Sequence, residues 1–252
     1  MVDGYQPLTD SQWQVMRLLL PVQRKRRLCL RQVVNAVLYV GRTGCQWRAL
    51  PATFPPWTAV YYFYHWQQSG RWQRLNHVLN VLDRLREGRE PLPALACVDS
   101  QSVKLAPRIC EHRGLDGGKH VNGRKRQILT DSGGRIWAAQ VHAAHHHDSR
   151  GALPLLPGRT WWTQPLALVL TDAAYRGHFA QHLGTLGLRH QIASRPPTQQ
   201  GFVPVAHRWV VERTFAWLAC FRRLALDYEY TPASHATWLL VANLTICLNR
   251  LA

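Results

Sequence analysis

The hydrophobic periodicity of this chain changes at residues 86–93, and that change constrains the fold more than any other feature. Before this stretch, apolar residues recur at helical spacing, and after it they form short runs typical of strands. The stretch itself reads REGREPLP, and its charges, glycine and prolines are typical of a linker. We therefore expect a helical region over residues 1–90 and a second region over residues 91–252.

The first region predicts four helices. Thr9 and Gln12 form a capping-box pattern that starts the first. The second has an apolar face over residues 30–40, and we expect Gly41 and Gly44 to end it. Short basic and aromatic helices fit a helix-turn-helix-like DNA-binding region, but the same pattern also fits a helical bundle with an aromatic core. The other two helices are expected from near Thr58 and over residues 71–86.

The second region predicts strands and then helices. Apolar runs at 94–98, 166–172 and 189–194 predict strands, and residues 126–144 predict a β-hairpin. Helical patterns follow at about 206–224 and 234–251. This order predicts a mixed α/β architecture.

The charge balance favours a polyanionic partner. The 252 residues include 31 Lys and Arg against 14 Asp and Glu, which gives a net charge of +17. Nucleic acid is the first candidate for that partner, and an anionic membrane surface or a merely basic soluble protein are the alternatives. No run of 18 apolar residues occurs, so we expect no membrane partner. The chain start lacks a signal-peptide pattern and the six cysteines form no CxxC pair, so a cytoplasmic location is expected.

Two aspartates occupy the same local position in the sequence. Asp99 follows the apolar run ALACV, and Asp172 follows LALVLT. Aspartate is a common turn residue, so one such position would be ordinary, but two carboxylates can share divalent cations. Glu212 lies in a helical pattern among apolar residues, where it is either functional or paired with Arg208 four residues earlier.

These residues lie in motifs that resemble a known family. The segments VDSQSVK, GRKRQILTD, LTDAAYRG and RWVVERTFAWLACFRRL look like those of the DDE transposases of bacterial insertion sequences, in the insertion-sequence-five-like group. The segment from LTDSQWQVMRLLLP to HWQQSGRW is similar to the region that precedes the catalytic core in that group. The resemblance covers nearly the whole chain.

The resemblance implies a fold, an activity and a cofactor. The implied fold is an RNase H-like core, and the implied activity is cleavage of transposon ends and strand transfer with Mg²⁺, for which Mn²⁺ can substitute. Motif matching places the three catalytic and metal-binding carboxylates at Asp99, Asp172 and Glu212. The implied partner is double-stranded DNA, and synapsis of two ends implies a homodimer or a larger assembly near the bacterial nucleoid.

The chain departs from the family signature at two positions. The signature has a tyrosine and a lysine where this chain has Val205 and Ala219, whereas Arg208 and Glu212 match it. The DNA-end contacts of the missing side chains are therefore in question. Arg222 and Arg223, about one turn beyond Ala219, are candidates to supply the missing positive charge.

The chemistry of phosphodiester cleavage explains these residue types. An in-line displacement needs an activated nucleophile and a stabilised leaving oxygen, and two hard cations about 3.5–4 Å apart supply both. Hard cations prefer carboxylate oxygens. Basic side chains near the carboxylates would hold DNA phosphates, although such a cluster can also be a solvated strand edge. The DNA-contacting candidates are Lys104, Lys119, Arg124, Lys125, Arg126, Arg176, Arg208, Arg213, Arg222 and Arg223.

The histidine run His145–His147 precedes Asp148 and invites a metal-site interpretation. Three consecutive side chains cannot all face one ion in regular structure, so a loop after the hairpin is favoured over zinc, and a role for His147 or Asp148 near the active site stays open.

Two alternatives to the transposase also stay open. One is an RNase H-like nuclease that cuts without joining, and the other is a domesticated DNA-binding protein that has lost catalysis.

Overall fold

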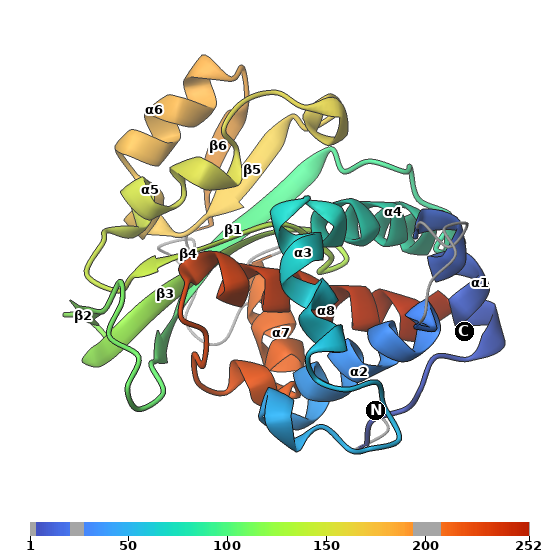
Figure 1. Ribbon diagram of the computed structural model, residues 1–252. Coiled ribbons are helices and arrows are strands. Elements are labelled where there is room, and N and C mark those ends of the chain that lie inside the picture. The colour runs from blue at the N-terminus through green and yellow to red at the C-terminus, as the bar shows by residue number, and fades with distance from the viewer. Residues whose placement is uncertain (1–3, 21–27, 194–207, 252) are drawn as a thin grey trace.

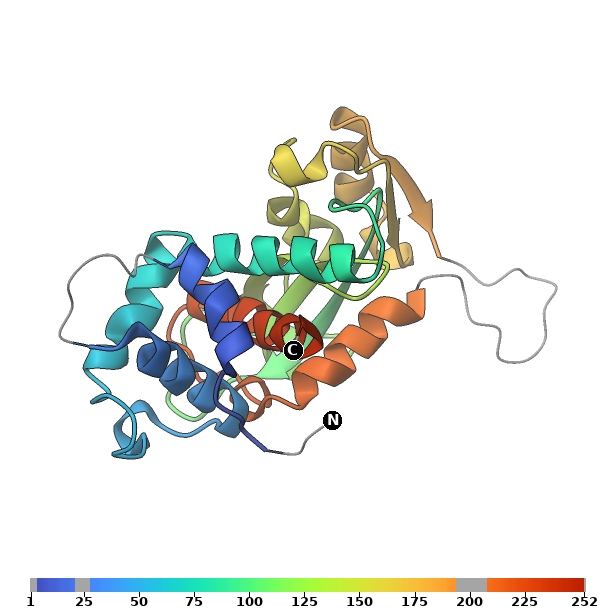
Figure 2. The ribbon, with the colours of Figure 1, turned by 90° about the vertical axis from the view of Figure 1, so that its right-hand side faces the viewer.

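The computed structural model describes residues 4–20, 28–193 and 208–251, and it shows a mixed β-sheet with helices on both faces (Figures 1 and 2). β1 is central, because it runs antiparallel to β3 on one side and parallel to β5 on the other. β2 and β4 pair with β3, and β6 pairs in parallel with β5. The described strands are β1 (Leu95–Lys104), β2 (Gly114–Asp116), β3 (Val121–Asp131), β4 (Ile136–Ala143), β5 (Leu168–Thr171) and β6 (Arg189–Ile192).

Each face of the sheet has its own hydrophobic core. Side chains alternate along a strand with a period of two, so Cys97 of β1 points to one core and its neighbours Ala96 and Val98 point to the other. The Cys97 core is covered by α1 (Asp10–Leu19), α2 (Leu30–Thr43), α3 (Tyr62–Gln68), α4 (Arg71–Arg86), α7 (Arg208–Ala219) and α8 (Pro232–Leu251). The opposite core lies beneath α5 (Asp148–Gly151) and α6 (His178–Thr185).

Short 3₁₀ turns connect these elements: η1 (Trp47–Ala49), η2 (Ala59–Tyr61), η3 (Leu153–Leu155), η4 (Trp161–Thr163), η5 (Ala173–Tyr175) and η6 (Arg222–Leu224). None of the helices within the described ranges has an apolar stretch long enough to cross a membrane.

Most helix signals in the sequence are confirmed, but the pattern expected to continue to about residue 224 is a helix only to Ala219, with the 3₁₀ turn η6 after it. The capping box is formed, with Gln12 N donating to Thr9 Oγ1 at 3.2 Å and Thr9 N donating to Gln12 Oε1 at 3.0 Å. Gly44 ends α2 in the left-handed region at φ 71°. The expectation that Gly41 also ends α2 is wrong: it lies inside the helix, where an added Cβ would come within 3.2 Å of the Trp238 ring. α3 begins at Tyr62, after the 3₁₀ turn η2, and not near Thr58.

The amino-terminal helices share their core with the end of the chain. Phe63 of α3 stacks on Trp238 of α8 with ring centroids 4.4 Å apart. The same cluster contains Met16 of α1 and Val37 of α2 together with Leu248 of α8. The linker at residues 86–93 therefore separates two stretches of the chain that pack against one core.

A buried ionic network joins α4 to α8 and to the β3–β4 turn. The Asp83 carboxylate accepts hydrogen bonds from Arg135 Nε at 2.8 Å, Arg250 Nη1 at 3.0 Å and Arg86 Nε at 3.0 Å. Burial by itself raises the pKa of Asp83, but the hydrogen bonds from Arg250 and Arg86 and the charge of Arg135 hold it below its ordinary value. Its stabilising contribution is therefore present at neutral pH and is lost as the pH falls through the aspartate range.

We predict that Asp83→Asn destabilises the fold at neutral pH. The substitution removes one of the three carboxylates that face the buried Arg135 guanidinium and the carboxylate that Arg250 and Arg86 share, which costs about 3 kcal/mol in unfolding free energy. Urea unfolding at pH 7 measures the change, with Glu90→Gln at an exposed position as the control. A destabilisation below about 1 kcal/mol would show that the network does not stabilise the fold.

Candidate active site

The register of β1 against β5 brings Asp99 and Asp172 together. The two strands pair in parallel at Leu95 with Leu168, Ala96 with Val169 and Cys97 with Leu170. The same register, continued by two residues, places Asp99 beside Asp172. By strand alternation both side chains fall on the face of Cys97 and Leu170, which α7 covers. The two aspartates line one small hollow of about 30 Å³ with Val211 of α7.

The structure corrects the expected position of Asp99 within its strand. β1 does not end at Asp99 but continues to Lys104, paired with β3 along its whole length. Pairing with β5 stops at Cys97, so Asp99 lies where the parallel neighbour ends. Asp172 follows the last residue of β5, and its Oδ1 accepts a hydrogen bond from Ala174 N at 2.9 Å, which caps η5. Both carboxylates are therefore fixed at one notch of the sheet, which is the place where β5 ends and β1 continues without a parallel neighbour.

Burial and neighbouring charge perturb Asp99. Burial is the main cause that raises the pKa of Asp99 from 3.8 to about 6, and the charges of Asp172 and Asp148 add to the rise. The hydrogen bond from Ser100 N at 2.7 Å and the charge of Lys119 oppose it. Lys119 therefore compensates the ionised form of Asp99 only in part, as expected for a carboxylate placed to bind a cation.

Glu212 lies on the helix that covers this notch, one residue after Val211. Its side chain is exposed. Among the residues that the structure describes, no three His, Cys, Asp or Glu side chains are grouped closely enough to hold a metal ion. The structure thus brings Asp99 and Asp172 together, and the assignment of Glu212 to the same site stays a prediction.

A second carboxylate system supports β1 from the face opposite Asp99. Asp148 Oδ1 accepts a hydrogen bond from Ser100 Oγ at 2.7 Å and an ion pair from Lys125 Nζ at 3.2 Å. Lys125 also faces Asp116 at 3.7 Å, and Asp116 accepts a hydrogen bond from Ser102. This ladder holds the part of β1 that has no parallel neighbour. Asp148 could be suspected from the sequence only by its place after the histidine run.

The comparisons with known proteins agree with this geometry. A family profile described as "Transposase DDE domain" matches residues 90–249, and another described as "Putative transposase of IS4/5 family" matches residues 8–76. The chain belongs to the DDE transposases. Its mixed sheet with helices on both faces is the RNase H-like core of that family, as the motifs implied.

Two curated relatives from Burkholderia cepacia are similar to this transposase. The "Putative transposase for insertion sequence element IS402" is 35% identical over 137 residues, which cover 51% of this chain and 64% of the relative. The "Insertion element IS402 uncharacterized 16.2 kDa protein" is 31% identical over 108 residues, which cover 38% of this chain and 72% of the relative. The chain thus matches less than two thirds of the length of the first relative.

Several basic residues that we expected to contact DNA are buried in the transposase. Arg124 is fully buried and donates to Asp227 Oδ2 at 2.9 Å and to the Glu229 carbonyl at 2.8 Å. Arg126 donates to Gln101 Oε1 and to the Leu224 carbonyl, and burial lowers its pKa to about 10. These two residues, together with Lys125, occupy the inner strand β3. The run GRKR is therefore neither a DNA-contacting surface nor a solvated strand edge.

The other cationic candidates divide by exposure. Arg223 is buried and donates to Glu229 Oε1 at 2.9 Å, so it cannot replace the signature lysine on the surface. Arg213 lies between the rings of Trp209 and Trp217, at 4.4 and 4.5 Å from their centroids. The exposed candidates are Lys104, Lys119, Arg176 and Arg222. Val205 and the Arg208 side chain lie outside what the structure describes.

We predict that Asp99→Asn stabilises the metal-free transposase at neutral pH. The pKa of Asp99 is raised in the folded state, so its contribution favours folding below the ordinary carboxyl pKa and is lost as the pH rises through about 6. Removing the charge should raise the unfolding free energy at pH 7 by up to about 3 kcal/mol, the equivalent of a two-unit shift. Urea unfolding with a chelator at pH 4 to 7 measures this, with Glu90→Gln as the control. An unchanged pH profile would contradict it.

Proposed function

We propose that this transposase binds the terminal inverted repeats of an insertion sequence, cleaves its ends and joins them to target DNA by two-metal phosphoryl transfer. The observation that carries the proposal is the pair Asp99 and Asp172, set side by side where β1 loses its parallel neighbour. Glu212 of α7 is proposed as the third catalytic carboxylate. The two strand residues are rigid because each is held in the sheet or in a capped turn.

The residues present fit a divalent cation. Mg²⁺ commonly takes only one or two protein carboxylates and keeps water and phosphate oxygens as its other ligands. Asp99 and Asp172 supply that number, and because the pKa of Asp99 is raised, positive charge beside it would relieve an existing electrostatic cost. When bound, two Mg²⁺ or Mn²⁺ ions would activate the attacking oxygen and stabilise the leaving oxygen.

The chain's own residues would orient this chemistry. Ser100 N and Lys119 face the Asp99 side of the site, and Lys119 Nζ lies 3.4 Å from the Ser100 carbonyl oxygen. The exposed ammonium of Lys119 is therefore placed to meet a phosphate near Asp99. Burial is the main cause that raises the pKa of the Tyr175 hydroxyl, the charges of Asp99, Asp148 and Asp172 add to the rise, and the Ser100 side chain opposes it.

The amino-terminal helices are proposed to recognise the transposon end. Arg48 lies over the ring of Trp57, which is 40% exposed, so a cation and an aromatic surface face solvent together. This pairing suits contact with DNA.

Because two ends are joined in one reaction, we propose a homodimer or a larger assembly that acts on DNA in the bacterial cytoplasm.

We predict that the three carboxylates fail in the same way when neutralised. Asp99→Asn, Asp172→Asn and Glu212→Gln should each lower Mg²⁺-dependent cleavage of an end-bearing duplex by several orders of magnitude, because the cations that activate the nucleophile are no longer held. Binding of the same duplex without Mg²⁺ should remain. Glu90→Gln is the matched control, and cleavage at the wild-type rate by any one variant would remove that residue from the site.

We predict that DNA binding depends steeply on salt. Each phosphate neutralised should contribute about −0.9 to the slope of log affinity against log salt concentration. Fluorescence anisotropy between roughly 50 and 200 mM salt measures that slope. An affinity independent of salt would contradict a phosphate-dominated interface.

One further measurement separates the transposase from its alternatives. Incubating the protein with a labelled end and a plasmid target in Mg²⁺ should give joined product. An RNase H-like nuclease would cleave the end without joining it, and a domesticated DNA-binding protein would do neither.

A further inference from the structure

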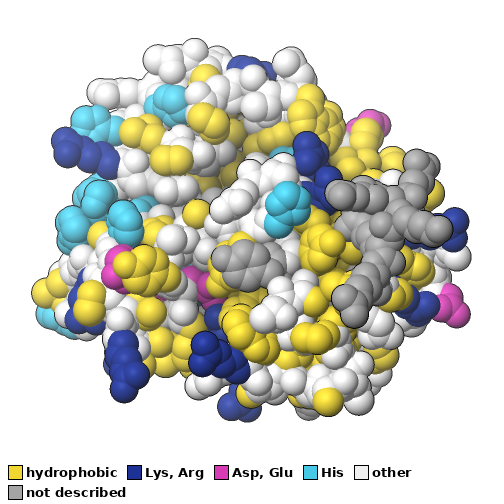
Figure 3. Space-filling view, viewed as in Figure 1, with side chains coloured by type: hydrophobic (Ala, Val, Ile, Leu, Met, Phe, Trp, Pro, Cys, Tyr) yellow, Lys and Arg dark blue, Asp and Glu magenta, His cyan; other side chains and the backbone are white. Residues whose placement is uncertain are grey.

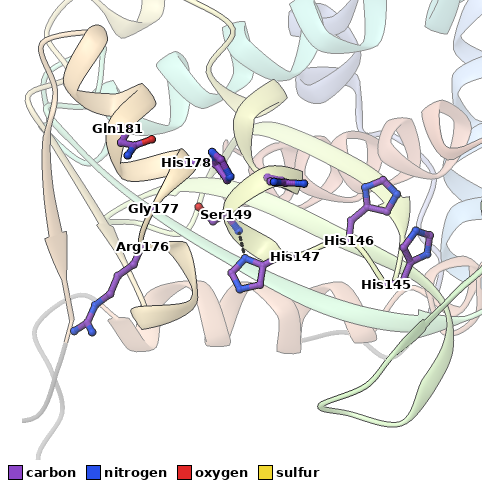
Figure 4. Close-up of a pocket in the computed structure, with 9 residues that line it drawn as sticks. His145, His146, His147, Ser149, Arg176, Gly177, His178 and Gln181 are labelled. Carbon is purple, nitrogen blue, oxygen red and sulfur yellow. Dashed lines mark hydrogen bonds between the residues drawn. The ribbon is translucent and has the colours of Figure 1, made fainter.

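A wide hollow lies on the sheet face that α5 and α6 cover, opposite the face of Asp99 and Asp172. Its volume is about 640 Å³, and Figure 4 shows residues of the segment before α5 facing residues at the start of α6 across it. Histidine and basic side chains gather on this flank of the molecule (Figure 3). The lining side chains that matter here are His145, His146, His147, Arg150, Arg176 and His178.

The lining chemistry suits an anion. None of the described residues that line the hollow is acidic, and all six of these side chains are exposed. The guanidinium groups of Arg150 and Arg176 have no hydrogen bond or ion pair with any other described residue. A neutral imidazole still donates one hydrogen bond, so the histidines can contact phosphate oxygens without being protonated.

Both walls of the hollow connect directly to the two aspartates. On one wall, Asp148 follows His147 and accepts the hydrogen bond from Ser100, the neighbour of Asp99. On the other wall, Arg176 ends the 3₁₀ turn that Asp172 caps. Ser149 Oγ joins the walls, because it accepts a hydrogen bond from Phe179 N at 2.9 Å. A ligand in the hollow would therefore contact the segments that hold the two aspartates, from the face of the sheet opposite their carboxylates.

Two other occupants fit less well. Within the described parts of the chain, no three potential ligands are arranged around one metal position, and this includes the histidine run. Pockets for small organic molecules are lined mostly by apolar and aromatic side chains, which this hollow lacks. An extended, polar and negatively charged chain matches the shape and the lining better.

We propose that this hollow binds the sugar–phosphate backbone of DNA, with Arg150 and Arg176 pairing with phosphates and the histidines donating hydrogen bonds. The proposal rests on the function proposed above, because it assigns a position to the same DNA. It adds Arg150, His145 and His178 to the contact surface, in place of the buried residues Arg124 and Arg126.

The test measures binding separately from chemistry. The full-length Asp99→Asn protein binds a fluorescent duplex of mixed sequence without divalent ions, and the double variant Arg150→Gln/Arg176→Gln is made in that background. We expect affinity at low salt to fall at least about tenfold, and the log–log salt slope to become shallower by about 0.9 for each phosphate that is no longer neutralised. His145→Asn/His178→Asn should weaken binding with a smaller change in slope.

Arg189→Gln in the same background is the control. It removes an arginine charge from an exposed position at the start of β6, which pairs with Leu168 at the end of β5 remote from Asp172. If the double variant keeps its melting temperature and binds duplex with unchanged affinity and salt slope, the proposal for the hollow is overturned. The proposed function is not affected by that result as long as the parent Asp99→Asn protein binds duplex. Failure of the parent to bind duplex would overturn the proposed function and this proposal together.

Discussion

The parallel pairing of β1 with β5 sets the positions of the two aspartates that we propose as catalytic. It lasts for three residue pairs and stops at Cys97 and Leu170, two residues before each aspartate. A longer β5 would place its backbone beside the next part of β1 and close the notch. A shifted register would turn one carboxylate to the opposite face, because side chains alternate along a strand. The short pairing thus leaves two carboxylates side by side at a small hollow under α7.

The shortness of this pairing leaves the rest of β1 to be supported in another way. From Val98 to Lys104 the strand has β3 as its only described neighbour in the sheet. Side chains compensate on the α5 face, where Ser100 and Ser102 bond to Asp148 and Asp116 around the ammonium of Lys125. Lys125 therefore contributes by pairing with both carboxylates that hold the strand carrying Asp99 in place.

Local patterns were sufficient to predict most of the elements. The capping box at Thr9, the hairpin from β3 to β4, and the two apolar runs before Asp99 and Asp172 all depend on neighbouring residues, and the structure contains each of them. β2 spans three residues and α5 spans four, too few to show a period. α6 reads HFAQHLGT, with two buried side chains, and so has little apolar pattern.

The basic run on β3 shows why the rest of the site could not be predicted. The sequence GRKR suggests a solvent-exposed segment. In the structure, however, Arg124 donates a hydrogen bond to Asp227, more than a hundred positions later in the chain, and Arg126 donates one to the Leu224 carbonyl. Partners at that distance leave no local signal. Asp148 was hidden for the same reason, since its contact with Ser100 joins segments 48 residues apart. Charge composition therefore predicts a kind of partner but cannot select the residues that would face it.

The shared core gives the amino-terminal helices a mechanical connection to the catalytic face. Arg42 of α2 donates a hydrogen bond to the Cys220 carbonyl just after α7 at 2.9 Å, and Gly44 approaches η6 closely enough that a Cβ would lie 3.1 Å from Arg222. α7 in turn packs on β1 and carries Glu212. If the amino-terminal helices bind the transposon end, a displacement of α2 would act through these contacts on α7, the helix that bears Glu212. Interiors packed at this density transmit such strain, so end recognition and completion of the carboxylate site can be coupled without a separate hinge.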